Sequence, residues 1–164
     1  MVQTKKLKLY LDTSIPSAYY NNSQPARQKI TQRWFENEAT NYELYTSNIA
    51  FEEIQQLKNE QKKTNIENLI FNYNIHLLTH NDKSQQLAEE YLDKGAIPKS
   101  EPFDAYHVAI AVLNGMDAIA SWNFSHLVSI NPIRKIHEIN KKHKFNIIEI
   151  GSLQIFGGEK YGTI

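Results

Sequence analysis

Apolar and polar residues alternate in several short stretches of the chain, and this alternation predicts β-strands. The first stretch, Leu7-Lys-Leu-Tyr-Leu-Asp12, ends at an acid. Longer segments with helical spacing separate these stretches. Strands that alternate with helices are typical of an α/β domain whose mainly parallel sheet is covered on both faces. The further strands are expected at residues 42–46, 75–78, 117–121 and 145–150, and the helices at residues 26–39, 48–63, 65–73, 82–94, 101–113 and 132–144.

Residues that favour helix ends punctuate this pattern. Ser14 is expected to cap a helix with Pro16 in its first turn, and Ser47 or Asn48 to cap the helix that ends near residue 63. Gly95 is expected to stop the helix before it. No repeat or shift in composition marks a second domain. We therefore predict one domain over residues 1–150 and a loose C-terminal tail over residues 151–164.

Composition narrows the class of protein. The 164 residues suffice for one domain, and 41% hydrophobic with 22% charged residues is typical of a globular chain. The absence of cysteine excludes zinc ribbons, thiol catalysis and a disulfide framework. Eighteen basic residues balance eighteen acidic ones, so no overall positive field attracts nucleic acid. Because neither a membrane span of ~20 apolar residues nor a secretion signal is evident, we expect a cytoplasmic protein with no membrane partner.

Helical geometry separates two adjacent glutamates. Ala50, Ile54 and Leu57 form an apolar stripe at helical spacing, and Glu53 borders this stripe. Glu52 points nearly the opposite way and is expected at the surface. An acid at the edge of a buried stripe is costly unless it is paired, either with a nearby lysine or within a site. Glu53 is therefore the candidate functional residue of the two.

Four more polar side chains fall at strand ends or on a helix that faces them. Asp12 follows the first strand, where an aspartate often caps a helix. Asp104 lies in the first turn of the next-to-last predicted helix, where the helix dipole favours an acid by ~0.3–1 kcal/mol. His107 shares a helix face with Asp104, although a lone histidine is more often a hydrogen-bonded core residue than a ligand. Asn123 follows the strand at 117–121 and, taken alone, indicates only a turn.

Together these positions predict one site. In open parallel sheets, sites form at the carboxyl ends of the strands, and Asp12, Glu53, Asp104 and Asn123 are all expected at that edge. Three converging carboxylates repel one another and raise their pKa values unless a cation lies among them. With oxygen ligands and no cysteine, the cation would be Mg²⁺ or Mn²⁺. Such an ion indicates phosphoryl chemistry, especially hydrolysis of phosphodiesters.

Four stretches carry these candidates together with recognisable neighbours. They are Leu9-Tyr-Leu-Asp-Thr-Ser14, Thr46-Ser-Asn-Ile-Ala-Phe-Glu-Glu-Ile54, Phe103-Asp-Ala-Tyr-His-Val-Ala-Ile-Ala111 and Gly115-Met-Asp-Ala-Ile-Ala-Ser-Trp-Asn-Phe-Ser-His-Leu127. In this order they resemble the PIN-domain family, which includes the VapC-like toxin ribonucleases of toxin–antitoxin pairs. With the flanking strands, the resemblance spans residues 7–150. It implies a three-layer α/β/α fold with a mainly parallel sheet of four or five strands, often in a homodimer.

The resemblance also implies roles for single residues. Asp12, Glu53 and Asp104 match the family's first three metal-binding acids. Asn123 matches the fourth position, where many members have Asp. Asparagine can ligate through its carbonyl or position a water, but it removes one negative charge, which bears on whether one or two ions bind. The implied activity is cleavage of RNA by an endoribonuclease that uses Mg²⁺ or Mn²⁺, and the implied partners are RNA and, for a toxin, a small antitoxin protein.

Contacts to RNA have to come from local features, because the net charge is zero. The segment over residues 132–144 is basic, although a solvated helix face is the more common explanation of such a segment. Some aromatic residues are candidates for stacking on bases, while most are expected in the core. The basic residues are Arg134, Lys135, Lys141, Lys142 and Lys144, and the candidate aromatic residues are Tyr19, Tyr20, Trp122 and Phe124.

Other functions fit less well. Haloacid-dehalogenase-like phosphatases need a second Asp two residues after the first, where this chain has Ser14, and receiver domains need an acidic pair where residues 4–8 are basic. A GTPase needs a glycine-rich phosphate loop after the first strand, and the sequence has none there. The remaining alternative is a PIN-like module that binds RNA or a protein with weakened catalysis, which Asn123 favours and the three acids oppose.

Overall fold

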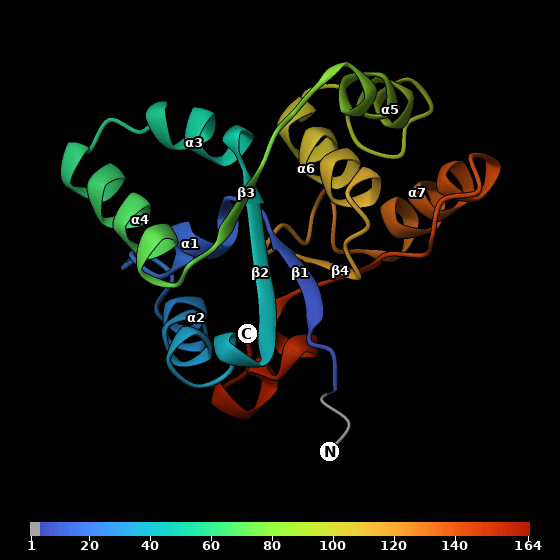
Figure 1. Ribbon diagram of the computed structural model, residues 1–164. Helices are drawn as coiled ribbons and strands as arrows, with labels where there is room; N and C mark the ends of the chain where they lie inside the picture. Colours follow the sequence, from blue (N-terminus) through green and yellow to red (C-terminus); the bar gives the residue numbers. More distant parts are fainter. Residues whose placement is uncertain (1–3) are drawn as a thin grey trace.

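The computed structural model describes residues 4–164 and places five strands in one sheet, in the order β3-β2-β1-β4-β5 (Figure 1). Every neighbouring pair of strands is parallel. The prediction of an α/β fold with a parallel sheet is therefore confirmed. The strands are β1 (Leu7–Leu11), β2 (Tyr42–Ser47), β3 (His76–Leu78), β4 (Ala118–Ala120) and β5 (Glu149–Gly151).

Helices cover both faces of the sheet and give it three layers (Figure 1). The helices are α1 (Ser14–Ala18), α2 (Pro25–Asn37), α3 (Asn48–Gln55), α4 (Glu60–Asn72), α5 (Asp82–Asp93), α6 (Pro102–Leu113) and α7 (Ile130–Lys142). α1, α2 and α4 pack on one face, and α5, α6 and α7 on the other. Within residues 4–164, none of these helices is long and apolar enough to cross a membrane.

The alternation along β1 divides the core into two halves. Leu9 and Leu11 point to the face where Trp34 of α2 is buried, whereas Tyr10 points to the face covered by α6. All four side chains are at most 1% exposed. This burial follows from the central position of β1, which has a paired strand on each side and helices above and below.

The segment predicted as one helix over residues 48–63 is two helices. Ser47 caps α3 as expected, because its side chain accepts a hydrogen bond from the backbone nitrogen of Ile49. The helix then ends at Gln55, and Asn59 starts α4 by accepting a hydrogen bond from the backbone nitrogen of Lys62. The expected helix over residues 65–73 is the second part of α4. A good N-cap inside a polar run therefore restarts the helix where apolar spacing alone suggested continuity.

Residues 152–161 are packed against the rest of the fold, so the expectation of a loose tail is wrong for this part of the segment. Two short 3₁₀ turns, Leu153–Phe156 and Gly158–Tyr161, lie against α2. The carbonyl of Phe156 accepts hydrogen bonds from Trp34 Nε1 at 2.9 Å and from the Tyr42 hydroxyl at 3.0 Å. Glu38 also pairs with Lys160 at 2.7 Å. These contacts hold the C-terminal segment on the same face as α2 and α4.

Candidate active site

The candidate acids lie on segments that reach the same sheet edge, where the strand order reverses beside β1. β2 lies on one side of β1 and β4 on the other, so the connections leave the sheet in opposite directions. Asp12 directly follows β1, and Asn123 lies three residues after β4. Glu53 is on α3, which follows β2 directly. Asp104 is in the first turn of α6, which runs back toward the start of β4 and so begins at the same edge.

Asp12 is held by the turn that leads into α1. Its carboxylate accepts hydrogen bonds from the backbone nitrogen of Ser14 at 3.0 Å and from the Ser14 hydroxyl. The same hydroxyl accepts a hydrogen bond from the backbone nitrogen of Trp122 at 2.8 Å. Ser14 was expected to cap α1, but it is the first helical residue and instead links Asp12 to the segment after β4. Asp12 itself is only 3% exposed.

Glu53 is part of a buried hydrogen-bond network centred on His107. Glu53 Oε1 lies 2.5 Å from His107 Nε2 and accepts a hydrogen bond from the Thr13 hydroxyl at 2.6 Å. On the other side of the ring, His107 Nδ1 lies 2.6 Å from the Tyr10 hydroxyl, which also contacts the Ser47 hydroxyl at 2.7 Å. The His107 side chain is 2% exposed and that of Glu53 is 27% exposed. His107 therefore fixes the position of Glu53 from inside the fold.

Asn123 contacts Asp104 through its amide nitrogen. Asn123 Nδ2 donates to Asp104 Oδ2 at 2.7 Å, and Asn123 Oδ1 accepts a hydrogen bond from the backbone nitrogen of His126 at 3.0 Å. The backbone nitrogen of Asn123 in turn donates to the Ser121 hydroxyl at 3.0 Å. In this arrangement Asn123 positions the carboxyl group of Asp104.

The pKa values of Asp12 and Asp104 are raised, and burial is the largest cause in each case. Burial raises the pKa of Asp12, and the neighbouring His107 opposes that shift. Burial, followed by the charge of Asp12, raises the pKa of Asp104 to about 7. Burial acts to lower the pKa of His107, but the hydrogen bond to Glu53 together with the charges of Glu53, Asp12 and Asp104 outweighs burial, so the pKa is raised. The site thus brings several carboxylates close together. Among the described residues of this hydrogen-bond network, His107 is the only one that can offset their negative charge.

The donor set fits a hard divalent cation, because it consists of carboxylate oxygens whose charge is incompletely balanced. One compact group of ligand atoms, all within 4.8 Å of one another, is formed by Glu101, Asp104 and His126 among residues 4–164. Asp12 and Glu53 lie outside that compact group, and the carboxylate of Glu53 is turned toward His107. The ligand set Asp12, Glu53 and Asp104 therefore stays a prediction, with Asp104 common to both groups.

The other sequence-based expectations differ in outcome. Glu52 is exposed and Glu53 half-buried, so the helical register drawn from the apolar stripe is confirmed. The basic residues of the 132–144 segment are exposed along and just after α7. Because α7 precedes the parallel strand β5, it begins at the edge with Asp12, and Lys141 and Lys142 at its other end are about 20 Å further along.

His107 is a buried, hydrogen-bonded histidine, as its sequence context favoured, but its link to Glu53 was not predicted. Its contacts with Tyr10 and Thr13 join positions 97 and 94 residues apart in the chain, which no local pattern reveals. The available signal was its spacing of three residues after Asp104 on a helix that is otherwise apolar. Burial of such a histidine requires a hydrogen-bond partner, and Glu53 was the borderline acid that needed one.

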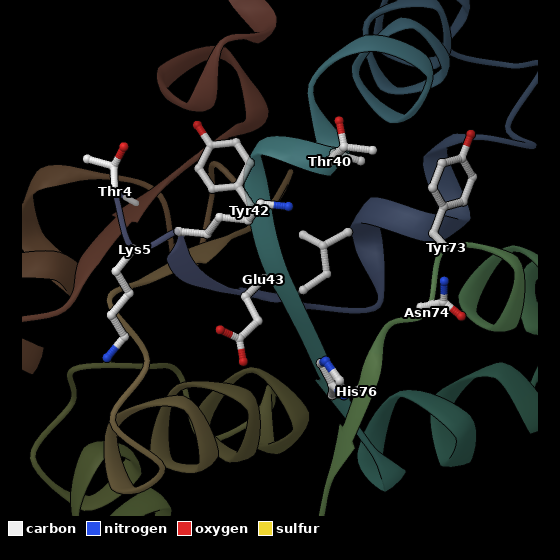
Figure 2. Close-up of a pocket in the computed structure, with 11 residues that line it drawn as sticks. Thr4, Lys5, Thr40, Tyr42, Glu43, Tyr73, Asn74 and His76 are labelled. Carbon is white, nitrogen blue, oxygen red and sulfur yellow. The ribbon is translucent and has the colours of Figure 1, made fainter. Parts of the chain in front are cut away.

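Two of the surface cavities differ in their position relative to the candidate site. The larger, of about 680 Å³, lies around the start of β2 and is lined by Lys5, Tyr42, Glu43 and His76, among others (Figure 2). Because β2 is parallel to β1, the start of β2 is at the sheet edge opposite Asp12. A second cavity, of about 370 Å³, is lined by Ser14 and Asn123 and so adjoins the candidate site.

Comparisons with known proteins support the fold and identify the family. VapC20 of Mycobacterium tuberculosis, a toxin that cleaves the sarcin-ricin loop, has the same fold with a TM-score of 0.55 and 17% identity, over 71% of this chain and 92% of that chain. A chain of VapBC2 from Rickettsia felis, solved with a DNA fragment from the promoter, gives a TM-score of 0.51 and 15% identity, over 88% of this chain and 98% of that chain. No curated protein matches the chain. The family model of the PIN domain matches residues 9–123, a segment that begins before Asp12 and ends at Asn123, and the chain therefore belongs to the PIN-domain family.

Proposed function

We propose that the protein is a metal-dependent endoribonuclease that hydrolyses phosphodiester bonds of RNA. The observation that supports this most directly is the convergence of Asp12, Glu53 and Asp104 at one sheet edge of a PIN domain, with the pKa of Asp104 raised to about 7 by burial and by Asp12. Such uncompensated charge is typical of a site that binds a divalent cation. Mg²⁺ and Mn²⁺ are the ions that suit this set of oxygen ligands.

Each residue of the site has a distinct part in this proposal. Asp12, Glu53 and Asp104 would hold the ion. A divalent ion bound there would supply charge stabilisation to the scissile phosphate and would acidify a water. Ser14 orients Asp12 through two hydrogen bonds, and Asn123 orients Asp104. These contacts fix the directions of the carboxylates before RNA arrives, which is the condition for efficient electrostatic catalysis.

We also propose that the protein is the toxin of a toxin–antitoxin pair, inhibited by a small antitoxin protein, acts in the cytoplasm and forms a homodimer. The support is the family membership together with the likeness in fold to VapC20, which is a toxin, and to a chain of VapBC2. The identity of 15–17% limits this likeness to the fold. RNA, rather than DNA, is proposed as the substrate because the resemblance to the PIN-domain family implies cleavage of RNA; VapC20, which shares the fold, is a toxin that cleaves the sarcin-ricin loop.

The proposal is tested by incubating the full chain with total RNA in Mg²⁺, in Mn²⁺ and in EDTA. Asp12→Asn keeps the size of the side chain but removes the charge, and should abolish cleavage. The control is Asp93→Asn, an exposed residue of α5 whose side chain is 75% exposed, and this variant should cleave like the parent chain. Both variants are purified in the same way, which separates the activity from any contaminating nuclease.

Two outcomes contradict the proposal. Cleavage that persists in EDTA or in Asp12→Asn would show that the carboxylates do not carry the reaction. RNA binding without cleavage in any of the three conditions would favour the alternative, a PIN domain with weakened catalysis that acts by binding, for which the neutral Asn123 is the supporting feature.

A further inference from the structure

The cavity beside the candidate site is lined by polar side chains and by one charged residue. Its volume is about 370 Å³. Among the described residues that line this cavity, Arg27 has the single charged side chain, and none has a carboxylate. It shares Ser14 and Asn123 with the candidate site, so it continues directly from Asp12 and Asp104. The lining residues are Ser14, Ser17, Ala18, Asn21, Arg27, Trp122, Asn123, Phe124 and Ser125.

Arg27 lies over two neighbouring aromatic rings, those of Trp122 and Phe124, whose centres are 6.1 Å apart. Its guanidinium carbon lies 5.4 Å from the centre of the Trp122 ring and 5.7 Å from that of the Phe124 ring. Its Nε atom is buried and has no hydrogen-bond partner among the described residues. Burial lowers the pKa of Arg27, and no carboxylate contributes to that shift. A partly buried guanidinium that lies over aromatic rings and has no carboxylate partner, at the wall of a cavity, is suited to an anion.

Hydrogen bonds around Trp122 hold its ring in place beside Arg27. Trp122 is 2% exposed, and its Nε1 donates to the Thr31 hydroxyl at 3.0 Å. Thr31 donates in turn to the backbone carbonyl of Arg27 at 2.8 Å. The ring against which Arg27 lies is thus tied to the helix that carries Arg27. Phe124, in contrast, is 39% exposed and presents part of its ring to solvent.

We propose that this cavity binds the nucleotide next to the scissile phosphate of the RNA, with Arg27 contacting the neighbouring phosphate and Phe124 stacking on the base. The inference rests on the proposed ribonuclease function and adds a binding subsite to it. An aromatic ring accepts any base, and arginine pairs with phosphate through two parallel hydrogen bonds. The overall charge is zero, so a single oriented cation beside the acids supplies local attraction that the whole molecule lacks.

Binding of RNA is measured separately from cleavage. The probe is a fluorescein-labelled single-stranded RNA of twelve nucleotides with randomised sequence, and the protein is the full chain with Asp12→Asn, in EDTA. In this background Arg27→Gln should weaken binding about tenfold and reduce the slope of log K against log salt by about 0.7, the value for one phosphate contact with a single strand. Phe124→Ala should weaken binding about tenfold without changing the slope.

Matched controls come from the same chain. Arg33→Gln changes an arginine of the same helix whose side chain is 59% exposed, and Phe71→Ala removes a phenylalanine that is 62% exposed on α4. Neither lines the cavity. Both controls should bind the RNA as the background protein does. If Arg27→Gln lowers the melting temperature, Arg27→Lys replaces it, since the lysine retains the charge and should restore the salt slope while losing part of the affinity.

The result that overturns the inference is an affinity and a salt slope for Arg27→Gln equal to those of Arg33→Gln, or binding by Phe124→Ala equal to that by Phe71→Ala. In the catalytically intact chain, Arg27→Gln should raise KM with kcat nearly unchanged. Failure of the ribonuclease function shows as absence of cleavage in the parent chain, whereas failure of the subsite shows as intact cleavage with an unchanged KM. The two failures are therefore distinguishable.

Discussion

Replacing Asp104 by Asn should stabilise the metal-free protein, although it removes a proposed metal ligand. The pKa of Asp104 is raised from 3.8 to about 7, and at about 1.4 kcal/mol per unit the ionised carboxylate destabilises the folded state by at most about 4 kcal/mol above pH 7. Partial exposure of Asp104 reduces this to about 2 kcal/mol through solvent screening. The asparagine can still accept the hydrogen bond from Asn123 Nδ2, so the substitution removes charge and little else.

The gain in stability has a defined dependence on pH. The pKa of Asp104 in the folded state lies above its value in the unfolded state, so from about pH 4 to pH 7 the folded chain keeps a proton that the unfolded chain has released. The stability of the parent chain therefore falls as the pH rises through this window. The variant lacks this titration. Its advantage should be complete at pH 8 and smaller by about two-thirds at pH 5.

The assay is thermal unfolding in EDTA at pH 8 and pH 5, followed by addition of Mn²⁺. An advantage of about 2 kcal/mol corresponds to a rise of roughly 4–8 °C in melting temperature for a chain of this size. Mn²⁺ should reverse the order, because the ion stabilises only the protein that binds it tightly. Asp93→Asn is the control. Equal melting temperatures of parent and variant at pH 8, or an advantage that does not change with pH, would refute the argument that the buried, ionised carboxylate of Asp104 destabilises the metal-free fold.

Three other predictions follow from the same contacts. Glu53→Ala should abolish metal-dependent RNA cleavage, whereas Glu52→Ala should leave it nearly intact, because only Glu53 contacts the His107 network. Equal losses of activity in a cleavage assay would contradict this. Asn123→Asp should show a larger rise in melting temperature with Mn²⁺ than the parent chain, and an unchanged rise would place residue 123 outside the reach of the ion. Tyr10→Phe should lower the free energy of unfolding by about 1–3 kcal/mol in urea titrations, because His107 Nδ1 loses its buried partner; a loss near zero would show that the hydroxyl is dispensable.

The sequence could predict the sheet and the edge at which the acids meet, because these depend on local patterns. The alternation that ends at Asp12 marks the end of β1, and the apolar stripe of α3 separates Glu53 from Glu52. Parallel strands place their carboxyl ends at one edge. From these rules alone the approximate location of Asp12, Glu53 and Asp104 follows, without knowledge of any side-chain contact.

The features that the sequence could not predict depend on contacts between distant residues. The indole nitrogen of Trp34 needs a buried acceptor, and the carbonyl of Phe156 provides it, 122 residues later. This contact makes the C-terminal segment part of the core, although its glycines suggest a loose tail. Arg27 is a similar case, because only the fold brings it beside Trp122 and Phe124 from a separate segment.

His107 also affects the charge of the site, in addition to holding Glu53 in position. In the metal-free protein its raised pKa favours the imidazolium, which lies 2.5 Å from Glu53 and offsets part of the charge of Asp12. A divalent cation among the acids would act on the same carboxylates and would favour release of the proton from His107, since like charges at close range oppose each other. Proton release and metal binding are therefore coupled through Glu53, and metal affinity should increase with pH through the range in which Asp104 and His107 titrate. The buried histidine thus serves the metal-free state, by keeping three acids together that would otherwise destabilise the fold.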